Sequence, residues 1–256
     1  GGRVEFLAVL AAADERETLL ATMDRAAAID PHPLFATDPP AGPIVLPAEL
    51  QAACDTDWDS PAVATRASAR PPHRGRVPDA RRPSDLRFAN GIGGFTPTGD
   101  EYVMTVDPCH PDGARLPPMP WTNVIANPTL GFLVSETGAG CTWSRNSRQH
   151  RLTPWTNDPI ADPHGEALWI RDQETGVFWS PLPGPTPAPA PYEVRHGFGQ
   201  TQWRHDSHGL TQETTMFVAR DEPVKIVRLR ITNAGTGPRR LGVVYYARLV
   251  LGVFPS

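Results

Sequence analysis

The sequence predicts a mainly β protein whose body is an antiparallel β-sandwich, and three observations support this prediction. From about residue 86 onward, apolar and polar residues alternate in short runs, as they do in strands with one buried face. These runs recur about every ten residues. Gly and Pro separate the runs, and no helical period lies between them. Short, regularly spaced strands with turn residues between them are typical of two antiparallel sheets packed face to face.

The alternation also identifies the individual strands. In the run 224–232, Val227, Leu229 and Ile231 point to one face, while Arg228 and Arg230 point to the other. The proline-rich stretch 181–191 predicts a polyproline-like excursion over the surface between two strands. The other runs that we expect to form strands are 102–106, 167–172 and 177–182 as a hairpin around the turn 173–176, 192–199 with 201–206 as a second hairpin, 210–218 and 241–251.

The first 85 residues differ in composition from the rest. Residues 1–30 carry apolar side chains among good helix formers and predict a short helical segment. Residues 31–85 are rich in Pro, Ala and Arg, lack periodicity and predict an extended linker. Residues 86–256 form the predicted sandwich domain. Because the sequence stops just after its last apolar run, we expect this domain to be truncated at its C-terminal end.

Composition excludes several classes of protein. The net charge of −4 and the isoelectric point near 6.1 give no reason to expect nucleic acid as a partner. The three cysteines lie far apart and form no C-x-x-C pair, which argues against a disulfide framework and a zinc site and fits a reducing compartment. No apolar run approaches the roughly 18 to 20 residues that a membrane-spanning helix needs.

The run 146–159, NSRQHRLTPWTNDP, is the best candidate for a functional site. Its hydrogen-bonding side chains surround Trp155, and Trp143 lies a few residues upstream. Such a mixture suits a pyranose, whose rim carries hydroxyls and whose faces carry C–H groups, and arginines add a site for phosphate or a carboxylate. A buried polar network that braces the sheet is an equal alternative. The polar residues concerned are Arg148, His150, Arg151, Asn157 and Asp158.

Four carboxylates near this run invite comparison with the acid pair of glycoside hydrolases. Asp158 and Asp162 each precede a proline, and Asp172 precedes a predicted hairpin turn. Asp in such positions bonds its own backbone, so a role in turns is the better interpretation. The fourth carboxylate is Glu166.

Two other patterns have simple explanations. The stretch 90–94, NGIGG, lacks the spacing of a phosphate-binding glycine loop, and we expect a tight turn with positive φ there. The D-x-D pattern within 55–59 lies in the predicted linker rather than at the end of a strand, so we attribute it to chance.

Five stretches carry a resemblance to a known family. The sequence resembles the N-terminal β-sandwich domain of the phosphorylases of glycoside hydrolase family 94, formerly glycosyltransferase family 36. It is similar in particular to the phosphorylase-like C-terminal region of cyclic β-1,2-glucan synthases. The resemblance covers roughly residues 86 to 252. The stretches are FANGIGGFTPTGDEYVM (88–104), 118–172, YEVRHGFGQTQW (192–203), VKIVRLRITN (224–233) and RRLGVVYYARLVLG (239–252).

The resemblance implies a fold and a reaction. The fold is a galactose-mutarotase-like supersandwich. The reaction is an inverting phosphorolysis, in which a carboxylic acid protonates the glycosidic oxygen while inorganic phosphate, the co-substrate, attacks the anomeric carbon of a β-glucoside. In the family that acid lies in an (α/α)6 barrel that follows the sandwich. No catalytic residue is therefore carried over to this chain, and no cofactor is implied.

The resemblance also implies partners and a site. The partners are a β-glucan oligosaccharide, the downstream barrel and a second subunit in a homodimer. The setting is the cytoplasmic face of a bacterial inner membrane. Two alternatives stay open: an autonomous carbohydrate-binding module, and the same domain of a cellobiose- or chitobiose-type phosphorylase. The segment 145–158 resembles the loops at the rim of the active site. The residues that we expect to contact sugar or the barrel are Arg148, Arg151, Thr153, Trp155, Asn157 and Asp158.

Overall fold

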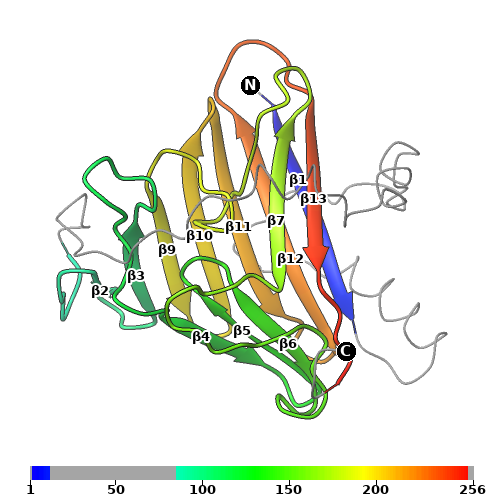
Figure 1. Ribbon diagram of the computed structural model, residues 1–256. Coiled ribbons are helices and arrows are strands. Elements are labelled where there is room, and N and C mark those ends of the chain that lie inside the picture. The colour runs from blue at the N-terminus through cyan, green and yellow to red at the C-terminus, as the bar shows by residue number, and fades with distance from the viewer. Residues whose placement is uncertain (1, 12–84, 253–256) are drawn as a thin grey trace. The chain divides into compact units, whose positions relative to one another are not determined.

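The computed structural model describes residues 2–11 and 85–252, which belong to one compact unit (Figure 1). In this part of the chain thirteen strands form one seven-stranded sheet and two three-stranded sheets. Every pair of neighbouring strands is antiparallel. None of the described residues forms a helix long and apolar enough to span a membrane. The predicted mainly β, antiparallel architecture is confirmed.

The large sheet has the order β1-β12-β11-β10-β9-β3-β2. Strands β9 to β12 follow one another along the chain as successive hairpins, the first of which is the predicted pairing of residues near 192–199 with 201–206. The strands are β1 (Arg3–Ala11), β12 (Val224–Asn233), β11 (Leu210–Val218), β10 (Gln200–Ser207), β9 (Tyr192–Gly197), β3 (Glu101–Val106) and β2 (Gly93–Phe95).

The two small sheets cover one face of the large sheet (Figure 1). Phe132 on β5, Leu168 on β7 and Leu229 on β12 are fully buried in one apolar cluster that joins all three sheets. Burial of this cluster is the main force that holds the sheets together. The small sheets are β4 (Thr122–Ala126), β5 (Leu130–Ser135) and β6 (Gly140–Ser144), and β13 (Leu241–Ala247), β7 (Glu166–Asp172) and β8 (Phe178–Trp179).

The N-terminal residues form a strand, so the predicted helical segment is wrong for residues 3–11. Strand β1 pairs with β12 along its whole length, with Phe6 opposite Leu229 and Ala8 opposite Val227. Apolar residues at every second position have the strand period, and β12 offers a row of backbone N–H and C=O groups that a further strand satisfies. This tertiary pairing overrides the helical propensity of the segment.

Residues 12–84 lie outside the described part of the chain. The remainder of the predicted helical segment, the linker at 31–85 and the D-x-D pattern at 55–59 therefore stay predictions. The predicted tight turn near residue 91 is confirmed: Gly91 has φ of 94°, and Asn90 Oδ1 accepts the backbone N–H groups of Ile92 and Gly93.

The proline-rich stretch 181–191 is not wholly a surface excursion. Leu182 and Ala188 are each 1% exposed and belong to the apolar core. The hydroxyl of Tyr192 donates to Ser180 O (3.0 Å) and accepts the N–H of Ala188 (2.8 Å), which closes the excursion against β9. The prediction of a surface excursion was wrong for residues 181–184 and for Ala188, which are buried, because the apolar side chains among them draw the segment inward.

Candidate functional site

The loop 145–158, which we call the arginine–tryptophan loop, follows β6. Its first part is a compact turn: Asn146 Oδ1 accepts the N–H groups of Arg148 and Gln149, both at 2.9 Å. Ser144 N–H donates to His150 O (2.9 Å), so the chain returns to the end of β6. This part of the loop is thus an ordered turn in which nearby residues supply the hydrogen-bond partners of the backbone.

Arg151 organises the second part of the loop. Its Nε donates to Ser147 O (3.0 Å), and its Nη1 donates to Trp155 O (3.4 Å). The half-buried guanidinium therefore joins two carbonyls on either side of it. Arg148 is exposed and Trp155 is partly exposed, so both side chains present surface to solvent at this end of the molecule.

Asn157 and Asp158 shape the exit of the loop. Asn157 is exposed and has φ of 53°, a left-handed conformation that Asn tolerates better than most residues. Asp158 Oδ1 accepts the N–H groups of Ile160 (2.9 Å) and Ala161 (3.0 Å). These backbone hydrogen bonds lower the pKa of Asp158. The predicted role of Asp158 in a turn is confirmed.

Thr153 lies in the interior, unlike the other predicted contact residues. It is 0% exposed; its hydroxyl donates to Glu166 Oε1 (2.7 Å) and accepts Thr142 N–H (2.8 Å). Thr142 Oγ1 also donates to Glu166 Oε1 (2.6 Å). For Thr153 the structure therefore matches the alternative interpretation, a buried polar network behind the sheet.

Glu166 is the centre of this network. Its Oε2 accepts a hydrogen bond from Tyr245 and forms an ion pair with Lys225, each at 2.5 Å. Burial alone would raise the pKa of Glu166, but the Lys225 charge and the hydrogen bonds lower the pKa to about 2. Burial and the Glu166 charge together raise the pKa of Tyr245. Glu166 is therefore an ionised carboxylate with donors on both of its oxygens.

Lys225, the ion-pair partner of Glu166, was not predicted from the sequence as part of this network. It lies on the same face of β12 as Val227, Leu229 and Ile231, so its side chain points into the core. A lysine at an apolar position of a strand is a signal that the sequence contains, because a buried lysine requires a partner. Its ammonium also lies 4.3 Å from the centre of the Phe132 ring.

The other two carboxylates support turns or pack internally. Asp162 is buried and accepts the hydroxyls of Ser135 (2.8 Å) and Thr137 (2.6 Å). Asp172 Oδ1 accepts Glu174 N–H (2.8 Å) in the predicted hairpin turn. In the described residues, no group of three or more His, Cys, Asp or Glu side chains has the arrangement of a metal site.

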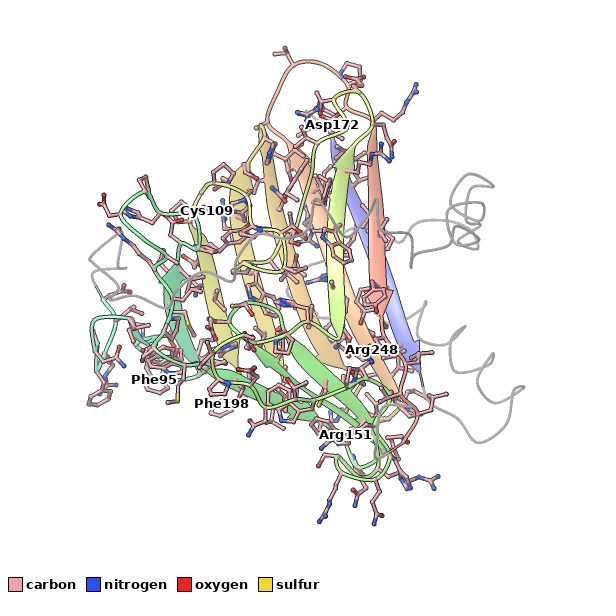
Figure 2. The ribbon with its side chains drawn as sticks, viewed as in Figure 1. Phe95, Cys109, Arg151, Asp172, Phe198 and Arg248 are labelled. Carbon is pink, nitrogen blue, oxygen red and sulfur yellow. The ribbon has the colours of Figure 1, made fainter. Side chains whose placement is uncertain are left out.

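The segment 248–252, which follows β13, runs beside the loop. Val250 N–H donates to Leu152 O and Gly252 N–H donates to Arg151 O, both at 3.0 Å. Figure 2 shows Arg151 and Arg248 at the same end of the molecule, opposite the end that carries Asp172. This end thus presents arginines and a partly exposed indole on a backbone that is fastened to the interior, an arrangement suited to binding.

Four of the tryptophans show which indoles serve the core and which lie near the loop. Trp179 and Trp203 are each 1% exposed and fill the core, where each indole N–H finds an acceptor. Trp143 and Trp155 are partly exposed beside the loop. Of these four, only Trp143 and Trp155 therefore have ring surface that a ligand could contact.

Known proteins share this domain. Residues 101–255 match the family described as "Glycosyl hydrolase 94, supersandwich domain". The chain is 41% identical over 169 residues to the cyclic beta-(1,2)-glucan synthase NdvB of Rhizobium meliloti (strain 1021), a match that covers 66% of this chain and 6% of that protein. It is 30% identical over 157 residues to the N,N'-diacetylchitobiose phosphorylase of Vibrio furnissii, covering 60% of this chain and 19% of that protein.

A third relative is the 3-O-beta-D-glucopyranosyl-beta-D-glucuronide phosphorylase of Paenibacillus borealis, 29% identical over 159 residues, which are 62% of this chain and 18% of that protein. The matched part of the chain thus spans less than a fifth of the length of each of these relatives. The family match covers more than half of the chain and agrees with the antiparallel sheets described above. The chain therefore belongs to glycosyl hydrolase family 94 and carries its supersandwich domain.

Proposed function

We propose that this chain is the non-catalytic, carbohydrate-contacting sandwich of the glycoside phosphorylase region of a cyclic β-1,2-glucan synthase-like protein. In this proposal the arginine–tryptophan loop lies at the rim of an active site that a downstream (α/α)6 barrel supplies. The observation that carries the proposal is the loop itself, whose exposed Arg148 and partly exposed Trp155 stand on a backbone anchored to the interior through Thr153. The 41% identity to a cyclic glucan synthase supports the choice of relative.

Each exposed side chain has a chemical role in this proposal. The indole of Trp155 packs against the C–H face of a glucose unit, and the amide of Asn157 bonds its hydroxyls. The guanidinium of Arg148 supplies positive charge for inorganic phosphate, the co-substrate, or for a carboxylate of the barrel. Protonation of the glycosidic oxygen belongs to the barrel, so we assign no catalytic residue to the sandwich.

The proposal extends to partners and setting. The carbohydrate is a linear β-1,2-glucan, the protein partners are the barrel and a second subunit in a homodimer, and the setting is the cytoplasmic face of a bacterial inner membrane. The identity to a cyclic glucan synthase is the support for the glucan.

Kinetics of the protein that contains both sandwich and barrel test the proposal. Initial rates of phosphorolysis of linear β-1,2-glucan are measured at varied glucan concentration for wild type, Trp155→Ala and Arg148→Ala. We expect the KM for glucan to rise in both variants, with Arg204→Ala as control, because Arg204 is an exposed arginine on the opposite face of the large sheet. An unchanged KM in both loop variants contradicts a place at the rim.

The second candidate is an autonomous carbohydrate-binding module, which the sandwich's own closed apolar core favours. Titration of the chain with linear β-1,2-glucan distinguishes the two. The proposal expects no measurable binding, because the barrel's half of the cleft is absent, whereas millimolar or tighter binding favours the module. A chitobiose-type phosphorylase is tested in the same kinetic assay with N,N'-diacetylchitobiose as substrate.

A further inference from the structure

Two segments that lie far apart in the sequence meet at the arginine–tryptophan loop. Segment 248–252 donates backbone hydrogen bonds to Leu152 O and Arg151 O, and Arg248 N–H donates to Gly165 O (2.8 Å). The segment therefore lies against the foot of the loop and is held there by backbone hydrogen bonds. A shift of either backbone breaks hydrogen bonds to the other.

The same two segments share a buried carboxylate. Glu166 Oε1 accepts the hydroxyl of Thr153, which belongs to the loop, and Oε2 accepts the hydroxyl of Tyr245, which lies shortly before segment 248–252. Lys225 holds the carboxylate from the large sheet. One side chain thus contacts the loop, the strand that leads into segment 248–252, and the sheet beneath them.

We infer that Glu166 is a positioning residue that couples the arrangement of the arginine–tryptophan loop to that of segment 248–252. A carboxylate that accepts hydrogen bonds through both oxygens fixes each donor relative to the others. The donors to Oε1 and Oε2 then cannot move independently unless a buried charge loses a partner. The inference goes beyond the proposed function, and only its consequence for sugar binding rests on that function.

A simple structural brace and a coupling residue make different predictions. A brace that holds each segment separately allows the effects of changes at Thr153 and Tyr245 to multiply. A shared carboxylate makes the two effects depend on each other, because the second change acts on a network that the first has already loosened. The dependence also vanishes when the carboxylate itself is replaced.

Hydrogen exchange of the full chain is the test. Amide exchange is followed by mass spectrometry in peptides that cover 146–158 and 248–252, for wild type, Thr153→Val, Tyr245→Phe and the double variant. We expect each single variant to speed exchange in both segments. Tyr245→Phe should do so by about fivefold to tenfold, the effect of losing one hydrogen bond, and Thr153→Val by more, because it also removes the acceptor of Thr142 N–H. The double variant should be no more than about twice as fast as the faster single variant.

Three further variants complete the test. Thr153→Ser keeps the hydroxyl and should restore wild-type exchange. Thr201→Val removes a buried, hydrogen-bonded threonine hydroxyl on β10 and should leave both segments unchanged relative to the other strands. In the Glu166→Gln background, the dependence between positions 153 and 245 should disappear.

Multiplying effects of Thr153→Val and Tyr245→Phe overturn the inference, and this result decides even where Glu166→Gln does not fold. If Thr201→Val speeds amide exchange in both segments as much as Thr153→Val or Tyr245→Phe does, the inference is overturned as well. The proposed function fails separately: Trp155→Ala with an unchanged KM for glucan contradicts the rim assignment and leaves the exchange results valid.

Discussion

Lys225 and Glu166 form an ion pair in the interior, with Nζ and Oε2 2.5 Å apart and side chains that are 3% and 6% exposed. Lys225 belongs to the large sheet and Glu166 to a small one, so the pair joins two layers of the sandwich. Removing both charges from water is costly, and the hydrogen bonds from Thr142, Thr153 and Tyr245 offset part of that cost. The buried ion pair therefore depends on these hydrogen-bond partners for its stability.

Loss of one member of the pair should be more harmful than loss of both charges. Lys225→Met leaves a buried, uncompensated carboxylate and should lower the free energy of unfolding by about 3–5 kcal/mol. The double variant Lys225→Met with Glu166→Gln should recover part of this loss. Urea unfolding followed by tryptophan fluorescence measures both. A Lys225→Met protein within about 1 kcal/mol of wild type contradicts the role of the pair.

The sequence was sufficient for the strands whose period is unambiguous. The alternation of Val227, Leu229 and Ile231 with arginines predicted β12 and the face that enters the apolar core. The arginine face is buried as well, which the alternation did not predict: Arg228 and Arg230 are 6% and 7% exposed. The N-terminal strand was not predicted, because its alanines and leucines suit a helix and its pairing with β12 depends on residues more than 200 positions away. Local propensity cannot report such a contact.

The sequence predicted the parts of the candidate site that depend on local neighbours, and not the parts that depend on how the strands pack. The turn role of Asp158 follows from its own neighbours in sequence, and the structure agrees. The burial of Thr153 and its bond to Glu166 depend on how β6, β7 and β12 pack, which no local pattern contains. Lys225 on an apolar strand face was the one sequence signal of this network. A buried lysine requires a buried anion, but the strand pattern does not identify which carboxylate it is.

Acid should weaken the fold through Glu166. The pKa of this carboxyl falls from an ordinary value of 4.5 in the unfolded chain to about 2 in the folded protein. The unfolded state therefore binds more protons between these values, and the stabilisation is present above about pH 4.5 and lost as pH falls toward 2. Urea unfolding at several pH values in this range should show a steeper loss for wild type than for Glu166→Gln with Lys225→Met. Equal slopes contradict the prediction.

His196 should affect stability at a higher pH than Glu166 does. Burial lowers the pKa of His196 from 6.5 to about 4, partly opposed by its hydrogen bond to Trp121 O. The unfolded state binds the proton first, so stability should fall by on the order of 2 kcal/mol as pH drops from about 6.5 to 4. His196→Gln should flatten this part of the pH profile, whereas His150→Gln, at an exposed position, should not. A profile unchanged by His196→Gln contradicts the assignment.

Gly140 should not tolerate a side chain. It opens β6, and a Cβ there would collide with the carbonyl oxygen of Leu133 on the neighbouring strand. Gly140→Ala should therefore lower the free energy of unfolding by about 2–3 kcal/mol, because the backbone must shift to relieve the contact. Gly237→Ala is the matched control, since nothing lies within 4 Å of the position that its Cβ would take. Equal melting temperatures for the two variants contradict the prediction.

Arg151 and Arg148 should differ in what they contribute. Arg151→Ala removes the hydrogen bonds to Ser147 O and Trp155 O and should cost about 1 kcal/mol of stability, while Arg148→Ala, at an exposed position, should change stability by less than about 0.5 kcal/mol. If the loop lies at the rim of an active site that a barrel completes, as proposed, both changes should also lower kcat/KM for phosphorolysis.

Arg151→Lys separates the two contributions of Arg151. A lysine keeps the positive charge but cannot bond two carbonyls through a planar fork, so it should retain charge-dependent binding while the loop loosens. Rates of phosphorolysis and melting temperatures are compared for the alanine and lysine variants. If Arg151→Ala leaves both the rate and the melting temperature unchanged, Arg151 neither braces the loop nor contributes to the site, which counts against placing the run 145–158 at the rim.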